Sequence, residues 1–257
     1  TAASPEETAL LPRLESVLGV LAAGNRFALA YSGGLDSRFL AHAAQRFGFE
    51  PVLLHIVGPH IPPEETDYAR HWAASRELAY AELPADPLDL ALVASGDRRR
   101  CYACKRNLFS LLKARTDLPL CDGTNASDAG QYRPGIRAVE ELGILSPLAS
   151  AGLTKADIRR LSREAGLFTW DKPAYACLAT RIPTGEALTG EALARVEGAE
   201  DALFRLGYTD FRVRVFHGAA RLQLPAGQLE RARPGRAALR AALAPYFKPI
   251  LLDLEER

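Results

Sequence analysis

Tyr31-Ser32-Gly33-Gly34-Leu35-Asp36-Ser37 connects the apolar run Phe27-Ala28-Leu29-Ala30 to the helical pattern of residues 38–47. The apolar run predicts a buried strand, so the quoted segment is a strand-to-helix turn. Such a turn points backbone N–H groups and the positive end of a helix dipole at one anion. Glycines at 33 and 34 let the backbone approach that anion closely. The stretch therefore predicts a pyrophosphate-binding loop.

This loop differs from the two commonest phosphate-binding patterns. A Walker loop requires Gly-x-x-x-x-Gly-Lys-Ser/Thr, and a dinucleotide fingerprint requires Gly-x-Gly-x-x-Gly. Here Ser32 and Ser37 supply hydroxyl donors, and Asp36 supplies a carboxylate for the magnesium that accompanies a triphosphate. Ser-Gly-Gly-x-Asp-Ser resembles the PP-loop of the ATP pyrophosphatases, which cleave ATP between its α and β phosphates and adenylylate a substrate. A plain strand-to-helix turn is the alternative.

The composition fits one large globular domain, or a large and a small one. Of the 257 residues 48% are hydrophobic, and 32 basic residues against 31 acidic ones give a net charge of +1. This total predicts no polyanion partner such as RNA. No apolar run reaches the roughly 18 to 20 residues of a membrane span, and residues 1–7 lack a secretory pattern. We expect a cytoplasmic protein with no membrane or nucleic-acid partner.

Strands and helices alternate along the first part of the chain. We expect strands at residues 26–31, 51–57, 79–83 and 119–121, and helices at residues 6–23, 38–47, 64–78, within 98–115, and at 154–165. The alternation predicts an α/β fold with a doubly wound parallel sheet, in which ligands bind at the carboxyl ends of the strands. The fourth strand is followed by Asp122, so we expect a second nucleotide contact at Gly123, Thr124 and Asn125.

The pattern changes near residue 188 and predicts a small C-terminal α/β domain. Its expected elements are helix 189–206, strand 211–216, strand 220–224, helix 226–243 and strand 248–252. The boundary is expected in the segment 182–190, which contains proline and glycine. The predicted domains are therefore residues 1–185, a PP-loop ATP pyrophosphatase domain, and residues 186–257.

Four cysteines include one close pair, Cys101 and Cys104, which is flanked by cations. The spacing suits one metal ion or cluster, although a closed zinc site takes four ligands. Cys121 ends an apolar strand, where a cysteine behaves as a small hydrophobe. Cys177 lies in an irregular segment bracketed by prolines, and such segments often carry sites. Three thiolates, from Cys101, Cys104 and Cys177, would hold a 4Fe-4S cluster; a redox pair with one buried thiol is the alternative.

Short strings along nearly the whole chain carry a more specific resemblance. They are Asp122-Gly-Thr-Asn-Ala-Ser-Asp128, Tyr132-Arg-Pro-Gly135, Ser146-Pro-Leu148, Gly152-Leu-Thr-Lys155, Trp170-Asp-Lys-Pro173 and Cys177-Leu-Ala-Thr-Arg-Ile-Pro183. Together they resemble the LarE family of PP-loop sulfur transferases, which act in building the nickel-pincer cofactor of lactate racemase. The resemblance implies that ATP adenylylates a carboxylate of pyridinium-3,5-biscarboxylic acid mononucleotide. Conversion of the activated carboxylate to a thiocarboxylate follows.

The resemblance also implies a role for one cysteine and leaves two sulfur sources open. In this family the cysteine of the Cys-Leu-Ala-x-Arg string, here Cys177, bears the sulfur. Members with only this cysteine give up its own sulfur and keep dehydroalanine after one turnover. Members with an added Cys-x-x-Cys are similar to cluster-dependent thiolases, and Cys101 and Cys104 indicate this second type. Family members resembling this chain form homo-oligomers, so we expect one here.

Two cations near the proposed sulfur site suit a substrate phosphate or carboxylate. They are Lys105 and Arg181, which we expect to be catalytic. The alternative to a catalytic role is, for Lys105, a place on an exposed helix face and, for Arg181, a structural ion pair. In the C-terminal domain, Glu200 and Arg214 are candidates for a phosphate site or an interface, although most charges there are solvated.

Three rival functions use the same loop. A cluster-dependent tRNA thiolase would share the adenylylation and the three cysteines, but the near-zero net charge speaks against it. An amidotransferase or synthetase of the NAD-synthetase kind has no need for Cys101, Cys104 and Cys177. A non-enzymatic ATP sensor or iron-sulfur carrier would bind the nucleotide without releasing pyrophosphate.

Overall fold

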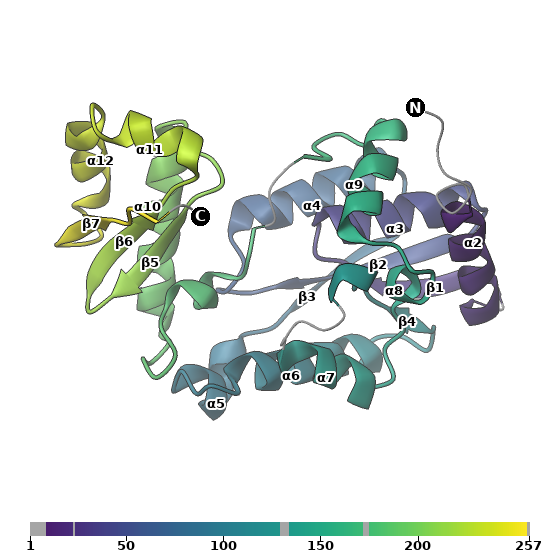
Figure 1. Cartoon of the computed structure of the whole chain (residues 1–257). Helices are drawn as coiled ribbons and strands as arrows, with labels where there is room; N and C mark the ends of the chain where they lie inside the picture. Colours follow the sequence, from purple (N-terminus) through teal and green to yellow (C-terminus); the bar gives the residue numbers. More distant parts are fainter. Residues whose placement is uncertain (1–8, 23, 129–133, 172–174, 256–257) are drawn as a thin grey trace. The chain divides into compact units, whose positions relative to one another are not determined.

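The described residues, which are 9–22, 24–128, 134–171 and 175–255, form a sheet of four parallel strands and a second sheet of three in this computed structural model. The backbone groups into two compact units (Figure 1). The first unit comprises Thr1–Gly58, Pro63–Ala85 and Cys101–Ala174, and the second comprises Pro59–Pro62, Asp86–Arg100 and Tyr175–Arg257. Each unit is described by itself below.

The parallel sheet has the strand order β3-β2-β1-β4. Its strands are β1 (Arg26–Ala30), β2 (Glu50–Val57), β3 (Tyr80–Pro84) and β4 (Leu120–Cys121). The apolar run forms β1 as expected, and its residues Phe27, Ala28 and Leu29 are fully buried. Strand β1 pairs with β2 on one side and with β4 on the other, where Leu29 lies opposite Cys121. Because β1 and β4 are adjacent and parallel, the loops that follow them lie together at the carboxyl ends of the strands.

Helices cover both faces of this sheet in Figure 1, with α3, α4 and α9 on one side and α6 and α7 on the other. Among the described residues, the helices of the first unit are α2 (Leu10–Leu21), α3 (Leu35–Arg46), α4 (Pro63–Ser75), α6 (Arg100–Ala114, whose first residue belongs to the second unit), the 3-10 helix η2 (Ala126–Asp128), α7 (Pro134–Glu141), α8 (Pro147–Ser150) and α9 (Lys155–Glu164). Helix α3 packs against β1, β2, α2 and α9. The apolar stripe of α2 buries Leu14 and Leu18 completely. This arrangement confirms the α/β fold class.

The second unit is built on the three-stranded sheet, in the order β5-β6-β7. Its regular elements are the 3-10 helices η1 (Pro87–Asp89) and η3 (Leu178–Arg181), helices α5 (Ala91–Ala94), α10 (Gly190–Arg205), α11 (Ala226–Ala232) and α12 (Arg236–Leu243), and strands β5 (Arg212–Phe216), β6 (Ala219–Gln223) and β7 (Ile250–Leu252). Strands β5 and β6 form an antiparallel hairpin, and β7 pairs with β6 in parallel. Helix α10 packs against β5 and α12.

One predicted helix was wrong. The segment 226–243 forms two helices, α11 and α12, instead of one. The break includes Pro234, whose ring removes the N–H that would continue the hydrogen-bond ladder, and Gly235, which is a weak helix former. The apolar periodicity continues through the break and concealed it. The short helices α5, α7 and α8 were not expected.

The segment 86–100 packs on the chain around residues 179–188 within the second unit. Leu188 donates its backbone N–H to the carbonyl of Ala94 over 2.8 Å, and Gly185 donates to that of Gly96 over 2.9 Å. A Cβ atom on Gly96 would lie 1.9 Å from the carbonyl oxygen of Glu186, so only glycine fits there. The second compact unit thus includes residues that precede 186 in the chain. The predicted domain ranges, 1–185 and 186–257, stay a prediction.

None of the described helices combines the length and the apolar character that crossing a membrane would require.

Candidate active site

The loop after β1 is shaped by a glycine that no other residue replaces well. Gly33 has a φ of +75°, a left-handed conformation that costs other residues about 1 to 2 kcal/mol. A Cβ atom at this position would lie 2.8 Å from the Cβ atom of Ala69 on α4. Two independent constraints, one local and one from packing, therefore require glycine here.

The hydroxyl groups of the loop converge on the start of α3. Gly34 donates its N–H to Ser32 Oγ over 3.3 Å, and Ser37 Oγ lies 3.3 Å from the same atom. Ser37 Oγ also donates to the carbonyl of Gly34 over 3.0 Å. The first intrahelical bond runs from Arg38 N to Gly34 O, so the preceding amides have no acceptor within the helix. Two hydroxyls thus lie beside the positive end of a helix dipole, an arrangement that suits an anion.

Arg38 holds this loop from inside the protein, a role that the sequence did not reveal. Its side chain is 1% exposed. Nε donates to the carbonyl of Gly33 over 3.0 Å, while Nη1 and Nη2 donate to the carbonyls of Phe168 and Thr169 over 2.8 and 3.3 Å. A guanidinium presents its donors in a rigid fork, so these bonds fix the Gly33 peptide.

The second predicted nucleotide segment lies against the first. A Cβ atom on Gly123 would be 3.1 Å from the backbone nitrogen of Ser37, so the two backbones are in close contact. Asp122 shapes the turn: its carboxylate accepts bonds from Thr124 N at 3.1 Å, Thr124 Oγ1 at 2.5 Å and Ser146 Oγ at 2.7 Å. Asn125 Nδ2 lies 3.5 Å from Asp36 Oδ2. The structure thus brings Gly123, Thr124 and Asn125 to the loop after β1, and their contact with a nucleotide stays a prediction.

Lys155 adds a cation that the sequence analysis did not assign. Its Nζ lies 2.5 Å from Asp36 Oδ1. Thr154 caps helix α9 through a capping box with Asp157, which places Lys155 at the first helical position. The Lys155 and Asp36 side chains are 31% and 24% exposed, and ion pairs this open contribute at most about 1 kcal/mol to stability. The string Gly152-Leu-Thr-Lys155 was the available signal, but its spatial partner lies 119 residues earlier.

Comparison with known proteins identifies the family. A pyridinium-3,5-bisthiocarboxylic acid mononucleotide synthase of Lactiplantibacillus plantarum is 30% identical over 210 residues, which cover 79% of this chain and 76% of that protein. The chain belongs to the LarE family. An uncharacterised protein of Synechocystis is 37% identical over 85% of this chain and 83% of its own length. Another, of Methanocaldococcus jannaschii, is 28% identical over 76% of each chain. No family model matches the sequence.

The four cysteines of this LarE-family chain lie in different surroundings. Cys101 is exposed and Cys104 half-buried in the first turns of α6, while the half-buried Cys177 precedes η3 in the second unit. Cys121 is fully buried at the end of β4, and burial raises the pKa of its thiol to about 12. Among the described residues, no three His, Cys, Asp or Glu side chains are arranged to hold a metal ion. The cluster of Cys101, Cys104 and Cys177 stays a prediction.

Arg181 forms the structural ion pair that the sequence analysis gave as an alternative. Its Nε lies 2.7 Å from Glu200 Oε1 and its Nη2 lies 3.1 Å from Oε2, with both side chains fully buried. Nη1 donates to the carbonyl of Ala176 over 3.2 Å. Glu200 also accepts bonds from the Tyr175 hydroxyl and from the Val213 N–H. Arg181 thus fixes the peptide directly before Cys177, and its role toward substrate stays a prediction.

Two more arginines lie close to this pair. Arg214 donates to the carbonyl of Thr180 over 2.7 Å, and burial together with Arg181 lowers its pKa. Arg212, which the sequence analysis did not single out, has its pKa lowered to about 10 because it is buried beside Arg181. Glu200 opposes these charges from within the same unit. The segment around residues 176–181 therefore lies in a strongly positive environment.

Lys105 packs on the string around Gly135. A Cβ atom on Gly135 would lie 2.6 Å from Lys105 Cδ, and Lys105 Nζ lies 5.3 Å from the centre of the Phe109 ring. The half-buried stem is therefore held against α7, and Lys105 is not simply part of an exposed helix face. Parts of two LarE-like strings, residues 132–133 and 172–173, lie outside the described residues.

We predict that Gly33→Ala abolishes tight nucleotide binding and lowers the free energy of unfolding by more than about 1 to 2 kcal/mol. Gly48→Ala is the matched control, because Gly48 has a φ of +83° but open space around its missing side chain. The control should show only the conformational cost. Urea unfolding and calorimetric ATP titration measure both effects. Equal destabilisation by the two substitutions would mean that the Ala69 contact does not matter.

Proposed function

We propose that the chain is an ATP-dependent sulfur transferase that converts carboxylates of pyridinium-3,5-biscarboxylic acid mononucleotide to thiocarboxylates. The observation that carries the proposal is the loop of Ser32, Gly33, Gly34 and Ser37, which presents hydroxyls and a helix N-terminus to one anion. The printed name of the Lactiplantibacillus relative supplies the substrate. If this loop holds the β and γ phosphates of ATP, it would stabilise pyrophosphate as the departing group.

The first half-reaction is the activation of the carboxylate. A carboxylate oxygen of the substrate attacks the α-phosphorus of ATP, forming an acyl adenylate and releasing pyrophosphate. Ser32, Ser37 and the first amides of α3 bind the departing phosphates, and the Lys155 ammonium offsets their charge. Gly123 permits the close approach of the second loop, with Thr124 and Asn125 beside the nucleotide.

Magnesium fits this site through Asp36. An ion that arrives on a triphosphate commonly takes one or two protein carboxylates, since phosphate and water oxygens supply the other ligands. The carboxylate of Asp36 lies at the first turn of α3 and now contacts Lys155 and Asn125. Bound there, the ion would offset negative charge on the departing pyrophosphate, and the Lys155 ammonium beside Asp36 would add a second positive charge to the site.

The second half-reaction delivers sulfur. A sulfur nucleophile attacks the acyl carbon, the bond to the AMP oxygen breaks, and AMP leaves with its electron pair. We assign the delivery to Cys177, with Lys105 as the cation on the substrate side and with Arg181, buried against Glu200, fixing the peptide before Cys177. A 4Fe-4S cluster held by Cys101, Cys104 and Cys177 would supply exchangeable sulfide. Donation by Cys177 of its own sulfur is the alternative.

The function is tested with ATP, magnesium and the pyridinium dicarboxylate. We expect release of pyrophosphate and formation of thiocarboxylate, both followed by mass spectrometry. Cys177→Ala should abolish the thiocarboxylate. The rate of pyrophosphate release in the first turnover should stay within about twofold of the parent rate, because activation precedes sulfur transfer. Cys121→Ala, at a fully buried thiol of the apolar core, should retain both steps. Loss of both steps in Cys177→Ala would make Cys177 structural, and release with tRNA alone would favour a tRNA thiolase.

Lys155 is tested by Lys155→Met, which removes the ammonium and keeps the length of the side chain. We expect pyrophosphate release at saturating ATP to fall at least about tenfold, as when one charge-stabilising group is removed. The free energy of unfolding should change by less than about 1 kcal/mol, since the ion pair is partly exposed. Lys113→Met, at an exposed lysine of the same unit, is the control. An unchanged rate in Lys155→Met would exclude Lys155 from the reaction.

The sulfur source is decided by iron analysis together with the mass of Cys177 after turnover. We expect anaerobically purified protein to hold about four irons per chain and to keep Cys177 intact. Cys101→Ser combined with Cys104→Ser should lose the iron. Iron-free protein whose Cys177 loses the elements of hydrogen sulfide in one turnover would establish the sacrificial route. The expected homo-oligomer is checked on the same preparation by light scattering.

A further inference from the structure

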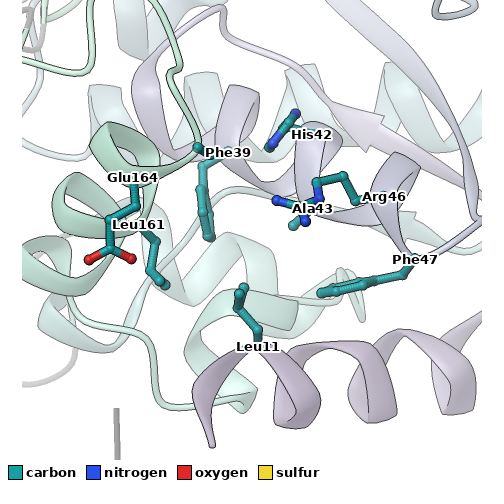
Figure 2. A pocket seen from close by; sticks show the side chains of 9 residues that line it. Leu11, Phe39, His42, Ala43, Arg46, Phe47, Leu161 and Glu164 are labelled. Carbon is teal, nitrogen blue, oxygen red and sulfur yellow. The ribbon is translucent and has the colours of Figure 1, made fainter. Parts of the chain in front are cut away.

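A cavity of about 210 Å³ lies in the first unit among helices α2, α3 and α9 (Figure 2). Its walls are mostly apolar, with Leu11 from α2, Phe39 from α3, Phe47 just after α3 and Leu161 from α9. The phosphate loop leads into the N-terminus of α3, whereas the cavity lies along its later turns. At 1.5 Å per residue, the seven residues from Asp36 to Ala43 span about 10 Å. The cavity is therefore separate from the proposed active site.

A buried polar group lines this cavity without a partner. His42 is 9% exposed, and its Nε2 has no hydrogen-bond partner among the described residues. Burial, with Arg76 and Arg46 nearby, lowers its pKa, so the ring is neutral at pH 7. A buried donor or acceptor left unsatisfied is destabilising, because it has lost its hydrogen bonds to water without gaining another. A ligand that bonds to Nε2 would recover that cost.

The cavity lining includes one positively charged side chain that makes no ion pair with any described residue, the exposed Arg46. Glu164, the acidic residue of the lining, already bonds to Arg160 over 3.2 Å. An uncommitted guanidinium beside an unpartnered imidazole suits a carboxylate, because both groups can donate to its oxygens.

We propose that this cavity is a second ligand site, which takes a small aromatic carboxylate. Its ring lies among Phe39, Phe47 and Leu161, and its carboxylate accepts bonds from His42 Nε2 and from Arg46. An apolar protein cavity of about 150 Å³ is large enough for benzene, so the larger volume here admits one ring with its carboxylate.

The site is tested on the full chain with 4-fluorobenzoate as the probe, by fluorine NMR. We expect saturable binding in the millimolar range, consistent with a ligand of ten heavy atoms. The neutral 4-fluorobenzamide should bind about three- to fivefold more weakly, and Arg46→Gln should weaken 4-fluorobenzoate by a similar factor. Arg115→Gln, at an exposed arginine outside the cavity, should leave the affinity unchanged.

A cavity-filling variant separates this site from adventitious binding. Ala165 lines the cavity from the end of α9 and is only half-buried, so Ala165→Phe should fold and occupy the space. Binding should be lost while the melting temperature is kept. Unsaturable binding to the parent chain, or binding that persists unchanged in folded Ala165→Phe, would overturn the proposal. If Ala165→Phe does not fold, equal affinities of the parent chain for 4-fluorobenzoate and 4-fluorobenzamide would overturn the proposal instead.

Discussion

The peptide of Gly33 is held by a buried guanidinium, and the arrangement of the loop after β1 depends on this interaction. Arg38 carries a full charge into the interior, where its donors meet the carbonyls of Gly33, Phe168 and Thr169. A buried charge is tolerated only when its hydrogen bonds are made, so all three carbonyls must stay in place together. The loop after β1 is thereby tied to the segment that follows α9.

Helices α3 and α9 also place two opposite charges beside this loop. Helix α3 begins with Asp36 and α9 begins with Lys155, and the packing of α3 on α9 brings these opposite charges into contact. Because the pair is partly exposed, its consequence is positional more than stabilising. The pair holds the Lys155 ammonium at the start of α3, beside the loop after β1, and a group that is already held in place costs less entropy to position.

The sequence predicted what local patterns encode. Strand, loop and helix follow one another within residues 26–46, so the glycines and the apolar run were enough to locate the strand-to-helix turn, whose binding of pyrophosphate stays a prediction. Lys155 escaped notice because its partner Asp36 lies 119 residues earlier. Arg38 escaped notice because its partners are backbone carbonyls, two of them at least 130 residues away, and carbonyls leave no mark in the sequence. The apolar periodicity of residues 226–243 masked the effect of Pro234. For Arg181 the sequence offered two roles, and only folding showed Glu200 as its bidentate partner.

The second unit is assembled from chain segments that are far apart in sequence. Arg100 donates to the carbonyls of Ala179, Ile182 and Pro183, and Gly96 accommodates the backbone of Glu186. A fragment that begins at residue 175 would lack both the guanidinium and the strip of backbone on which those residues rest. The unit is therefore unsuited to transfer between proteins as a single continuous piece, and gene fusions or truncations must retain residues 86–100 along with it.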